Sequence, residues 1–475
     1  MPAEEKQGEV NWRALLICVA IGSILWFIPP PNELEAAAWH LFSIFVATIV
    51  ALVIKPVPMG STAIIALTLI VLTQTLTLEE SLSGFQNTTI WLIVIAFFIS
   101  RGFIKTGLGT RIAYLFVRLF GKKTLGLSYA MLFSDLILAP AMPSNTARAG
   151  GIIFPIIRSL AETYESRVGD GTERRVGAFL TKTAFQGDMI TSAMFVTAMA
   201  ANPLAVQITQ DVTGETITWG GWALAALVPG LISLFLIPLV IYKLYPPELK
   251  ETPEAPDIAG RKLKEMGPLK RSEKYMIGVF VLLLSLWIFG ANIGLNATTS
   301  AFVGLCVLLL TQVLSWSDIK KEQGAWDTLV WFAVLVMMAT YLNELGMIPW
   351  FSELMQESAS QLSWTIALIV LAIVYFYSHY FFASNTAHVS AMYAAFLSVI
   401  VAAGAPPLLS ALILAFFSNL FGCLTHYGAG PAPVFFGSGY VSQQKWWLLG
   451  FVISIIHIVV WIGIGGLWWK LLGLW

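Results

Sequence analysis

The stretches PSNTARAGG at residues 143–151 and ASNTAHVSA at residues 383–391 decide the fold of this chain. Each places Ser-Asn-Thr-Ala, followed directly by a basic residue, inside a segment that is otherwise apolar. Serine, asparagine and threonine cap the N-termini of helices, and Pro143 ends a helix that precedes it. Each stretch therefore predicts a helix that begins anew within an apolar region.

The composition predicts a membrane protein. Of 475 residues, 57% are hydrophobic and only 11% are charged, whereas soluble domains contain about 25% charged residues. The alternative, a soluble protein with a very large core, fits this charge content poorly. The formal net charge is zero and no basic tract suggests nucleic acid. Cys18, Cys306 and Cys423 lie in separate apolar segments without metal-binding spacing, so we expect neither a metal site nor a disulfide framework.

Apolar segments of two kinds follow one another along the chain. Uninterrupted runs long enough to cross a bilayer fall at 12–29, 36–54, 60–76, 88–106, 222–242, 276–291, 298–315, 327–343 and 447–471. Segments interrupted by proline, glycine and polar residues fall at 124–163, 177–203, 362–403 and 407–436. We expect an all-α integral membrane protein with about 11 transmembrane helices and two re-entrant hairpins.

Basic residues are distributed unevenly among the connections between these segments. One set of connections contains Lys55, Arg118, Lys122, Lys123, Arg158, Arg167, Arg174, Arg175, the loop 243–275, Lys320, Lys321 and Lys445. The other set contains no lysine or arginine and comprises 30–35, 77–87, 204–221, 292–297 and 344–361. By the positive-inside rule the first set is cytoplasmic. We therefore expect a multi-pass protein of the cell's inner (plasma) membrane, with its N-terminus in the cytoplasm and its C-terminus outside.

The chain contains an internal repeat. TTIWLIVIAFFISRGFIKTGLG at 88–109 resembles DTLVWFAVLVMMATYLNELGM at 327–347, and their aligned tryptophans are 240 positions apart. Ser144 and Ser384 are also 240 positions apart. With the orientation above, the two repeats run in opposite directions through the membrane. Inverted repeats are typical of secondary transporters with a binding site near the midplane.

The two polar stretches are predicted to lie at hairpin tips. The segment from 124 must return to the side it enters, because Lys122 and Arg167 are both on the basic side. By the same reasoning, 362–403 enters from the opposite side. Non-helical backbone at membrane depth is tolerated only where it is buried or lines a cavity. Each tip would point a helix N-terminus, which attracts anions, at a shared central space.

The interrupted segments at 185–203 and 418–437 are expected to be broken helices beside the tips. Gly428, Gly430 and Pro431 predict a break near Thr425. Gly187, Thr191 and Ser192 give a softer signal in the first of these segments. Such breaks would supply hydroxyl and backbone N–H groups to the central space.

Charged residues within the apolar segments require a reason, because a charge at bilayer depth costs about 2.5–3.5 kcal/mol. Arg148 and His388 fall in the first turn of the new helices, where the helix dipole disfavours a cation unless an anion is near. Either they supply positive potential to a bound dianion, or each binds a carboxylate or carbonyl and holds the tip. His426 is a comparable candidate. Lys182 and Asp188 are expected to pair, and Asp135 and His379 receive no role.

The paired motifs at 144–146 and 384–386, in inverted repeats, resemble the divalent anion–sodium symporter (DASS) family over the whole chain. ITSAMFVTAMAANPLA at 190–205 and CLTHYGAGPAPVFFGSGYV at 423–441 are most similar to its exchanger branch. The resemblance implies a homodimer that works by an elevator movement and needs no cofactor. The residues that it implies around the substrate are Ser144, Asn145, Thr146, Ser384, Asn385 and Thr386, with Thr191, Ser192, Thr425 and Gly430 alongside.

The resemblance also implies two kinds of domain. The expected parts are a scaffold at 1–122 and 273–361, a transport domain at 123–245 and 362–475, and a cytoplasmic linker at 246–272. The transport parts contain the hairpins 124–163 and 362–403 and the broken helices 177–203 and 407–436.

Sodium-coupled members of the family form two sodium sites around these tips. This sequence departs from them by carrying His426 in the second loop and bulkier residues in the first. Fixed cations at Arg148, His388 and His426 would replace the charge that sodium brings. We expect a sodium-independent antiporter of dicarboxylates such as malate, succinate, fumarate and 2-oxoglutarate, with citrate and tartrate as further candidates. The alternatives are a sodium-coupled dicarboxylate symporter and an anion channel. An enzyme is disfavoured, because no HExxH, GxSxG or Cys/His cluster occurs.

Overall fold

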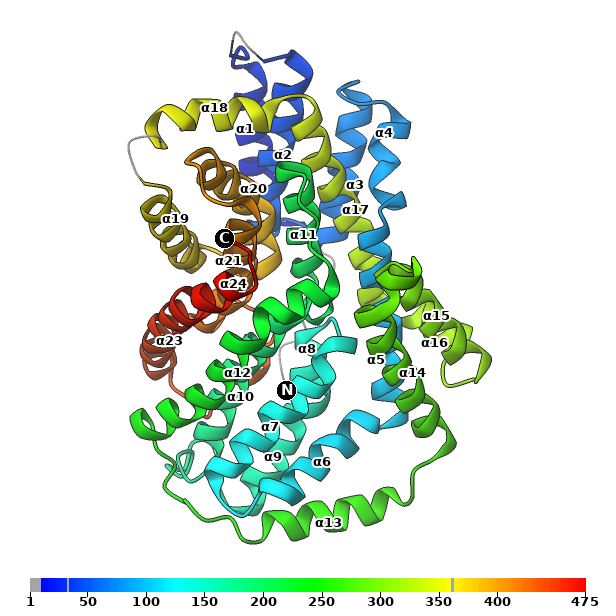
Figure 1. Ribbon diagram of the computed structural model, residues 1–475, viewed down its shortest axis with the longest axis vertical. Coiled ribbons are helices and arrows are strands. Elements are labelled where there is room, and N and C mark those ends of the chain that lie inside the picture. Colours follow the sequence, from blue (N-terminus) through cyan, green and yellow to red (C-terminus); the bar gives the residue numbers. More distant parts are fainter. Residues whose placement is uncertain (1–9, 32–33, 360–362) are drawn as a thin grey trace.

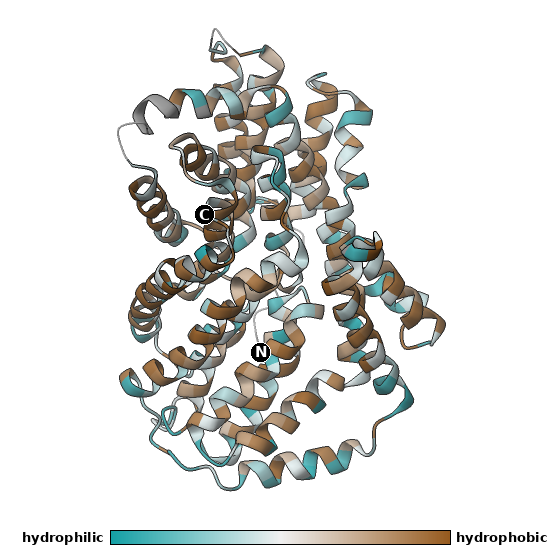
Figure 2. Ribbon diagram, in the orientation of Figure 1, coloured by the Kyte–Doolittle hydropathy of each residue, from teal (hydrophilic) through white to brown (hydrophobic). Residues whose placement is uncertain are grey.

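The computed structural model describes residues 10–31, 34–359 and 363–475, and within these ranges every regular element is helical (Figure 1). Residues 1–9, parts of the connections 30–35 and 344–361, and the first residue of the predicted hairpin 362–403 lie outside the described residues. Most helices are predominantly hydrophobic, and hydrophilic residues gather along the lower edge and in loops (Figure 2). The all-α prediction is confirmed.

The first part of the chain forms a set of helices, three of which begin at a polar side-chain cap. They are α1 (Trp12–Phe27), α2 (Ala36–Ile54), α3 (Met59–Leu72), α4 (Leu78–Leu82), η1 (Ser83–Gln86), α5 (Thr88–Thr106) and α6 (Leu108–Phe120). Asn87 caps α5 by accepting hydrogen bonds from the backbone N–H groups of Thr89 and Ile90. Gly107, with a φ of +77°, ends the same helix in a left-handed conformation that glycine adopts without strain.

The middle part of the chain follows, and its helices from residue 255 onward pack onto this first set. Its helices are α12 (Trp219–Leu244), α13 (Ala255–Met266), α14 (Arg271–Phe289), η5 (Gly290–Ile293), α15 (Ala297–Leu310), α16 (Trp316–Lys321), α17 (Gln323–Glu344) and α18 (Met347–Ala359). Helix α5 packs against α15 and α17, and α17 packs against α3. The helices that carry the aligned tryptophans are therefore neighbours.

Many helices are suited to a bilayer. In the described part of the chain, nine helices are long and apolar enough to cross a membrane. Their outward faces are apolar: Phe27 is 83% exposed and Leu310 is 82% exposed. Exposed apolar residues on this scale would be unfavourable in water and are expected against lipid. The chain is a multi-pass membrane protein.

The interrupted segments and the last apolar run of the chain form a second group of elements. They are α7 (Thr124–Leu138), η2 (Ala139–Ala141), α8 (Asn145–Arg148), η3 (Ala149–Ile153), α9 (Phe154–Thr163), α10 (Gly177–Met194), η4 (Val196–Ala198), α11 (Ala201–Thr213), α19 (Trp364–Ser378), η6 (His379–Phe381), α20 (Asn385–Ala402), α21 (Pro407–Leu420), η7 (Phe421–Cys423), α22 (Ala432–Phe436), α23 (Gln443–Ile458), η8 (Val459–Gly465) and α24 (Gly466–Leu471). Helix α10 is central to this group, because it packs against α7, α12 and α21.

The two polar stretches have the same local structure. In both, a helix ends in a three-residue 3₁₀ turn, three residues follow, and a new helix begins at asparagine. Each of these boundaries recurs 240 positions later, from Leu138 to Ser378 and from Asn145 to Asn385. The sequence offset is thus an offset between structural elements.

The first broken helix is interrupted later than the sequence indicates. The softer signal at Gly187, Thr191 and Ser192 predicted the wrong position, because α10 continues to Met194 and the break spans Phe195 to Ala200. A Cβ at Gly187 would come within 2.5 Å of the Leu132 side chain. This glycine therefore permits close packing of α10 on α7 and does not break the helix.

The segment predicted as a plain linker is structured. It contains α13, which packs against α6 and lies along the lower edge of the molecule (Figure 1). The backbone N–H of Thr124 donates to the carbonyl of Lys250 at 3.0 Å, and that of Thr252 donates to the carbonyl of Lys122 at 2.9 Å. The linker is thus fixed to connections that were assigned to the same basic side.

Candidate functional site

The first tip, at residues 143–147, is held by its own polar residues. Ser144 caps α8, and its Oγ accepts a hydrogen bond from the backbone N–H of Ala147 at 3.1 Å. Asn145 Oδ1 accepts one from the backbone N–H of Thr146 at 2.9 Å. Asn145 is buried, whereas Thr146 is exposed. The predicted cap is confirmed, and the threonine side chain lies at the accessible end of the tip.

The second tip, at residues 383–387, repeats this cap and adds a bond to a neighbouring helix. Ser384 Oγ accepts a hydrogen bond from the backbone N–H of Ala387 at 3.4 Å. Asn385 Nδ2 donates to the carbonyl of Ser418 in α21 at 2.9 Å. Thr386 is half-buried. The asparagine thus anchors this tip to the helix that leads into the second break.

Both tips contact the break of the second broken helix, which consists of η7 and the loop 424–431. A Cβ at Gly430 would collide with Thr146 Oγ1 of the first tip. A Cβ at Gly422, in η7, would lie 3.3 Å from Asn385 Nδ2 of the second tip. Two helix starts that are far apart in sequence therefore contact one break, and their sharing of a substrate site stays a prediction.

Arg148 lies behind the first tip and is fully buried. Its Nε donates to Asp135 Oδ1 at 2.8 Å, and its Nη2 donates to Asp188 Oδ1 at 3.1 Å and to Ser192 Oγ at 2.8 Å. Thr191 Oγ1 donates to Asp135 Oδ2. Arg148 thus binds two carboxylates, as expected of a residue that holds the tip in place. Thr191 and Ser192 are buried next to this cluster.

The same guanidinium binds backbone carbonyls on both sides of the tip. Arg148 Nη1 donates to the carbonyl of Met142 at 2.6 Å and to that of Ala198 at 2.7 Å. Ala198 belongs to the break between α10 and α11. Arg148 therefore connects the first tip to the loop of the first broken helix.

The predicted pairing of Lys182 with Asp188 is wrong, because Asp188 binds Arg148 instead. Lys182 Nζ donates to the carbonyl of Trp446 at 3.2 Å and lies 4.0 Å from the centroid of that indole ring. A buried lysine is stabilised by such a carbonyl and aromatic face.

His388 takes the place that Arg148 has in the first tip, and it acts with a second histidine. Its Nδ1 lies 3.0 Å from Nδ1 of His379, and its Nε2 lies 3.2 Å from Ser378 Oγ. His379 Nε2 donates to the carbonyl of Gly428 at 2.8 Å. A hydrogen bond between the two Nδ1 atoms needs one proton there. The pair connects the second tip to the loop of the second broken helix.

His426 and Thr425 lie in that same loop. His426 is half-buried, and its Nδ1 accepts a hydrogen bond from Trp447 Nε1 at 3.0 Å. Thr425 is buried, and its Oγ1 has no hydrogen-bond partner among the described residues. The loop thus contains a buried hydroxyl that no described residue binds.

Sequence reasoning missed several residues that hold the site together. Asp135 and His379 received no role, although they bind Arg148 and His388. Asn202 and Asn419 join the two broken helices through a hydrogen bond of 2.7 Å. The available signal was a polar or charged residue inside an apolar segment, which indicates a partner but does not identify it.

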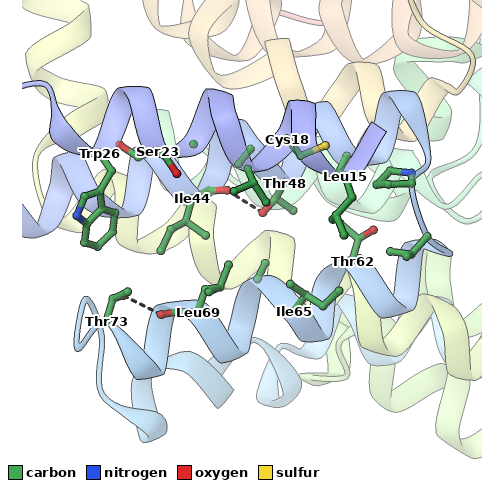
Figure 3. Close-up of a pocket in the computed structure, with 18 of the residues that line it drawn as sticks. Leu15, Cys18, Ser23, Trp26, Ile44, Thr48, Thr62, Ile65, Leu69 and Thr73 are labelled. Atoms are coloured by element: carbon green, nitrogen blue, oxygen red, sulfur yellow. Dashed lines mark hydrogen bonds between the residues drawn. The ribbon is translucent and has the colours of Figure 1, made fainter. Parts of the chain in front are cut away.

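A groove of about 340 Å³ lies elsewhere, between α1, α2 and α3 (Figure 3). Its lining is largely apolar, and the hydroxyls of Ser43, Thr48 and Thr73 donate to carbonyls of their own helices. No residue of either tip lines it. The groove suits lipid contact and is separate from the candidate site.

Comparisons with known proteins identify relatives of this chain over nearly its whole length. The family profile described as the sodium:sulfate symporter transmembrane region matches residues 9–475. YflS of Bacillus subtilis (strain 168), provisionally named a malate transporter, is 68% identical over 99% of this chain and 98% of its own. Dicarboxylate transporter 1 of spinach chloroplasts (Spinacia oleracea) is 51% identical over 98% of this chain and 82% of its own. The L-tartrate/succinate antiporter of Escherichia coli O6:K15:H31 is 37% identical over 96% and 98%.

Two solved structures share the fold at low sequence identity. The YdaH transporter of Alcanivorax borkumensis is 14% identical, with a TM-score of 0.57 over 82% of this chain and 87% of its own. MtrF of Neisseria gonorrhoeae is 13% identical, with a TM-score of 0.58 over 98% and 96%. The family match and the close relatives show that the chain belongs to the sodium:sulfate symporter family of membrane transporters, the divalent anion–sodium symporters that its two tip motifs resemble.

Proposed function

We propose that this transporter exchanges C4 and C5 dicarboxylates across the membrane. Malate, succinate, fumarate and 2-oxoglutarate are the expected substrates, with citrate and tartrate as further candidates. Relatives over nearly the whole chain are named for malate, for dicarboxylates and for tartrate/succinate antiport. Their identities of 37–68% support a common class of substrate.

The observation that carries the proposal is the contact of two capped helix starts with one break. A helix N-terminus binds an anion through free N–H groups and the positive end of its dipole. Two such ends suit a substrate with two carboxylates. One carboxylate would bind at Ser144, Asn145 and Thr146, and the other at Ser384, Asn385 and Thr386.

The residues around the tips would complete the site in two ways. Thr425 and Gly430 would contact substrate from the loop of the second broken helix. Thr191 and Ser192 would act from behind the tip, because both are buried in the cluster around Arg148.

The contacts beside the tips favour transport without sodium. Sodium needs oxygen ligands, and protein donors already bind three of the backbone carbonyls beside the tips. Arg148 Nη1 binds the carbonyls of Met142 and Ala198, and His379 Nε2 binds that of Gly428. The transport step would therefore not need sodium. The two helix N-termini, with His388 and His426, would provide the positive potential near the substrate, whereas the charge of Arg148 is compensated by the carboxylates that it binds.

The movement would be of the elevator type within a homodimer. The transport domain, at 123–245 and 362–475, would slide against the scaffold at 1–122 and 273–361, with 246–272 as the linker. Packing of α10 with α7, α12 and α21 supports one compact moving unit. The two domains would be built from inverted repeats in the inner membrane, with the basic connections in the cytoplasm.

Counterflow tests the substrate class and the site together. Proteoliposomes loaded with malate, fumarate, 2-oxoglutarate, citrate, tartrate, sulfate or acetate take up labelled succinate from outside. We expect dicarboxylates to support uptake and acetate to fail. Asn145→Ala and Asn385→Ala should lose at least about tenfold in uptake, about 1.4 kcal/mol, and remain folded. Ser398→Ala, further along α20, is the matched control and should transport normally, because its hydroxyl donates only to the carbonyl of Ala394 in the same helix. Normal uptake in both asparagine variants would exclude the proposed site.

A further inference from the structure

The guanidinium of Arg148 holds two carboxylates in a place that fits one. The Nε and Nη2 atoms of arginine donate in parallel from one edge, which matches the two oxygens of a single carboxylate. Arg111 uses this edge in the ordinary way: its Nε donates to Glu273 Oε1 at 2.5 Å and its Nη2 to Glu273 Oε2 at 3.2 Å. In Arg148 the same two positions are taken by Asp135 Oδ1 at 2.8 Å and Asp188 Oδ1 at 3.1 Å. Oxygens of two carboxylates therefore lie next to one another.

This cluster is removed from water. Arg148, Asp135 and Asp188 are 0%, 3% and 2% exposed. Two ionised carboxylates and one guanidinium would leave one uncompensated negative charge, which is costly in a buried site. Two carboxylates this close do not both ionise readily, and sharing one proton removes the repulsion.

The hydrogen bonds distinguish the two carboxyl groups. Both oxygens of Asp135 accept hydrogen bonds, one from Arg148 Nε and one from Thr191 Oγ1. Asp188 Oδ1 accepts from Arg148, whereas Asp188 Oδ2 is buried and has no partner among the described residues. Hydrogen bonds therefore stabilise the ionised form of Asp135 at both of its oxygens, whereas those of Asp188 reach only one of its oxygens. We propose that Asp188 carries a proton, which makes the Asp135–Arg148–Asp188 cluster a neutral proton-binding site.

The other ionisable groups on the elements around the cluster have partners of their own. Lys182 of α10 donates to the carbonyl of Trp446, and Tyr129 of α7 donates to the carbonyl of Phe235. Arg158 and Glu162 of α9 form an ion pair on an exposed face. The Cys423 thiol donates to the carbonyl of Gly450. Lys243 lies in the last turn of α12, far along that helix from its start at Trp219. The first tip therefore carries no net charge from this cluster, whichever anion the protein transports.

Three carboxyl-to-amide variants of the full-length protein, purified in detergent, test the proposal. Asp188→Asn replaces a neutral acid by a neutral amide and should shift the apparent melting temperature by no more than about 2 °C. Asp135→Asn removes the ionised member, and Glu273→Gln is the matched control at a single-carboxylate pair. Both should lower the melting temperature by at least about 5 °C. A loss in Asp188→Asn as large as that in Glu273→Gln would overturn the proposal.

Infrared spectroscopy and a pH series detect the proton directly. The wild type should show the carbonyl band of a protonated carboxylic acid, and Asp188→Asn should lack it. A proton that is held only in the folded state makes stability fall as the pH rises, so the wild type should lose stability at alkaline pH faster than Asp188→Asn. An unchanged band in Asp188→Asn would contradict the assignment. Stabilisation of the wild type by sodium, absent in Asp188→Asn, would also overturn it by indicating a cation at Asp188 Oδ2.

Discussion

Gly430 is the residue through which the loop 424–431 approaches the first tip. Its Cα lies so close to Thr146 that a Cβ would collide with the threonine hydroxyl. Gly430 does not have a positive φ, so the need for glycine here is one of space. The contact between the tip and the loop therefore depends on the absence of a side chain.

Alanine at position 430 should separate the loop from the tip. Inserting a methyl group into a close contact costs about 1–3 kcal/mol, so Gly430→Ala should lower substrate affinity in counterflow by about tenfold or more. Gly151→Ala is the control, because a Cβ at Gly151 has nothing within 4 Å. Equal transport by the two variants would show that the contact does not shape the site.

The sequence predicted the residues of the tips better than their partners. Ser144 and Ser384 act as caps because capping is a local property of a helix start. The partners of Arg148 lie 13 and 40 positions away in α7 and α10. Those contacts depend on how the helices pack, which no local pattern specifies.

At the scale of elements, each tip is tied to the loop of the broken helix that follows it. In the first tip Arg148 binds the carbonyl of Ala198, and in the second His388 reaches the carbonyl of Gly428 through His379. Both connections fix a tip to a loop, but the first uses a guanidinium group and the second uses a pair of imidazole rings. A rigid arrangement of tip and loop would let them move as one body.

Two isosteric replacements separate the two bonds of His379. Glutamine places its amide where Nε2 lies and can still donate to Gly428, whereas asparagine reaches only the position of Nδ1, beside His388. We expect His379→Gln to retain more exchange activity than His379→Asn, because it keeps the tie to the loop. The reverse order would show that the contact with His388 matters more. Melting temperatures of both variants check that each is folded.

Elements with strong local signals were predicted, and elements set by packing were not. The second break follows from Gly428, Gly430 and Pro431, and the structure has it between η7 and α22. The first break was placed too early, because Gly187 resembles a helix breaker but permits contact with Leu132. Helix α13 was missed because a polar, proline-containing segment gives no clear apolar period.

At the scale of the whole molecule, three basic segments of the chain lie on one side. The linker 246–272 is bonded to the connections at Lys122 and at Arg174 and Arg175, so these three basic segments lie together. Their common location agrees with the charge pattern that predicted it. The orientation itself, with the N-terminus in the cytoplasm, stays a prediction.

Thiol labelling in intact cells tests that orientation. In a Cys306→Ser background, which removes the exposed native thiol, a membrane-impermeant reagent should label Glu215→Cys directly. It should label Lys264→Cys only after the membrane is permeabilised. Both positions are exposed in the structure, so access depends on the side of the membrane. The opposite pattern would reverse the topology.

Uptake with and without sodium tests the central claim most directly. The claim is that two helix starts bind a dicarboxylate for exchange without sodium. Proteoliposomes containing the purified protein take up labelled succinate, with or without internal malate, in sodium or in choline buffer. We predict uptake that requires internal malate and is equal in the two buffers. Uptake into empty vesicles that depends on sodium would contradict the claim.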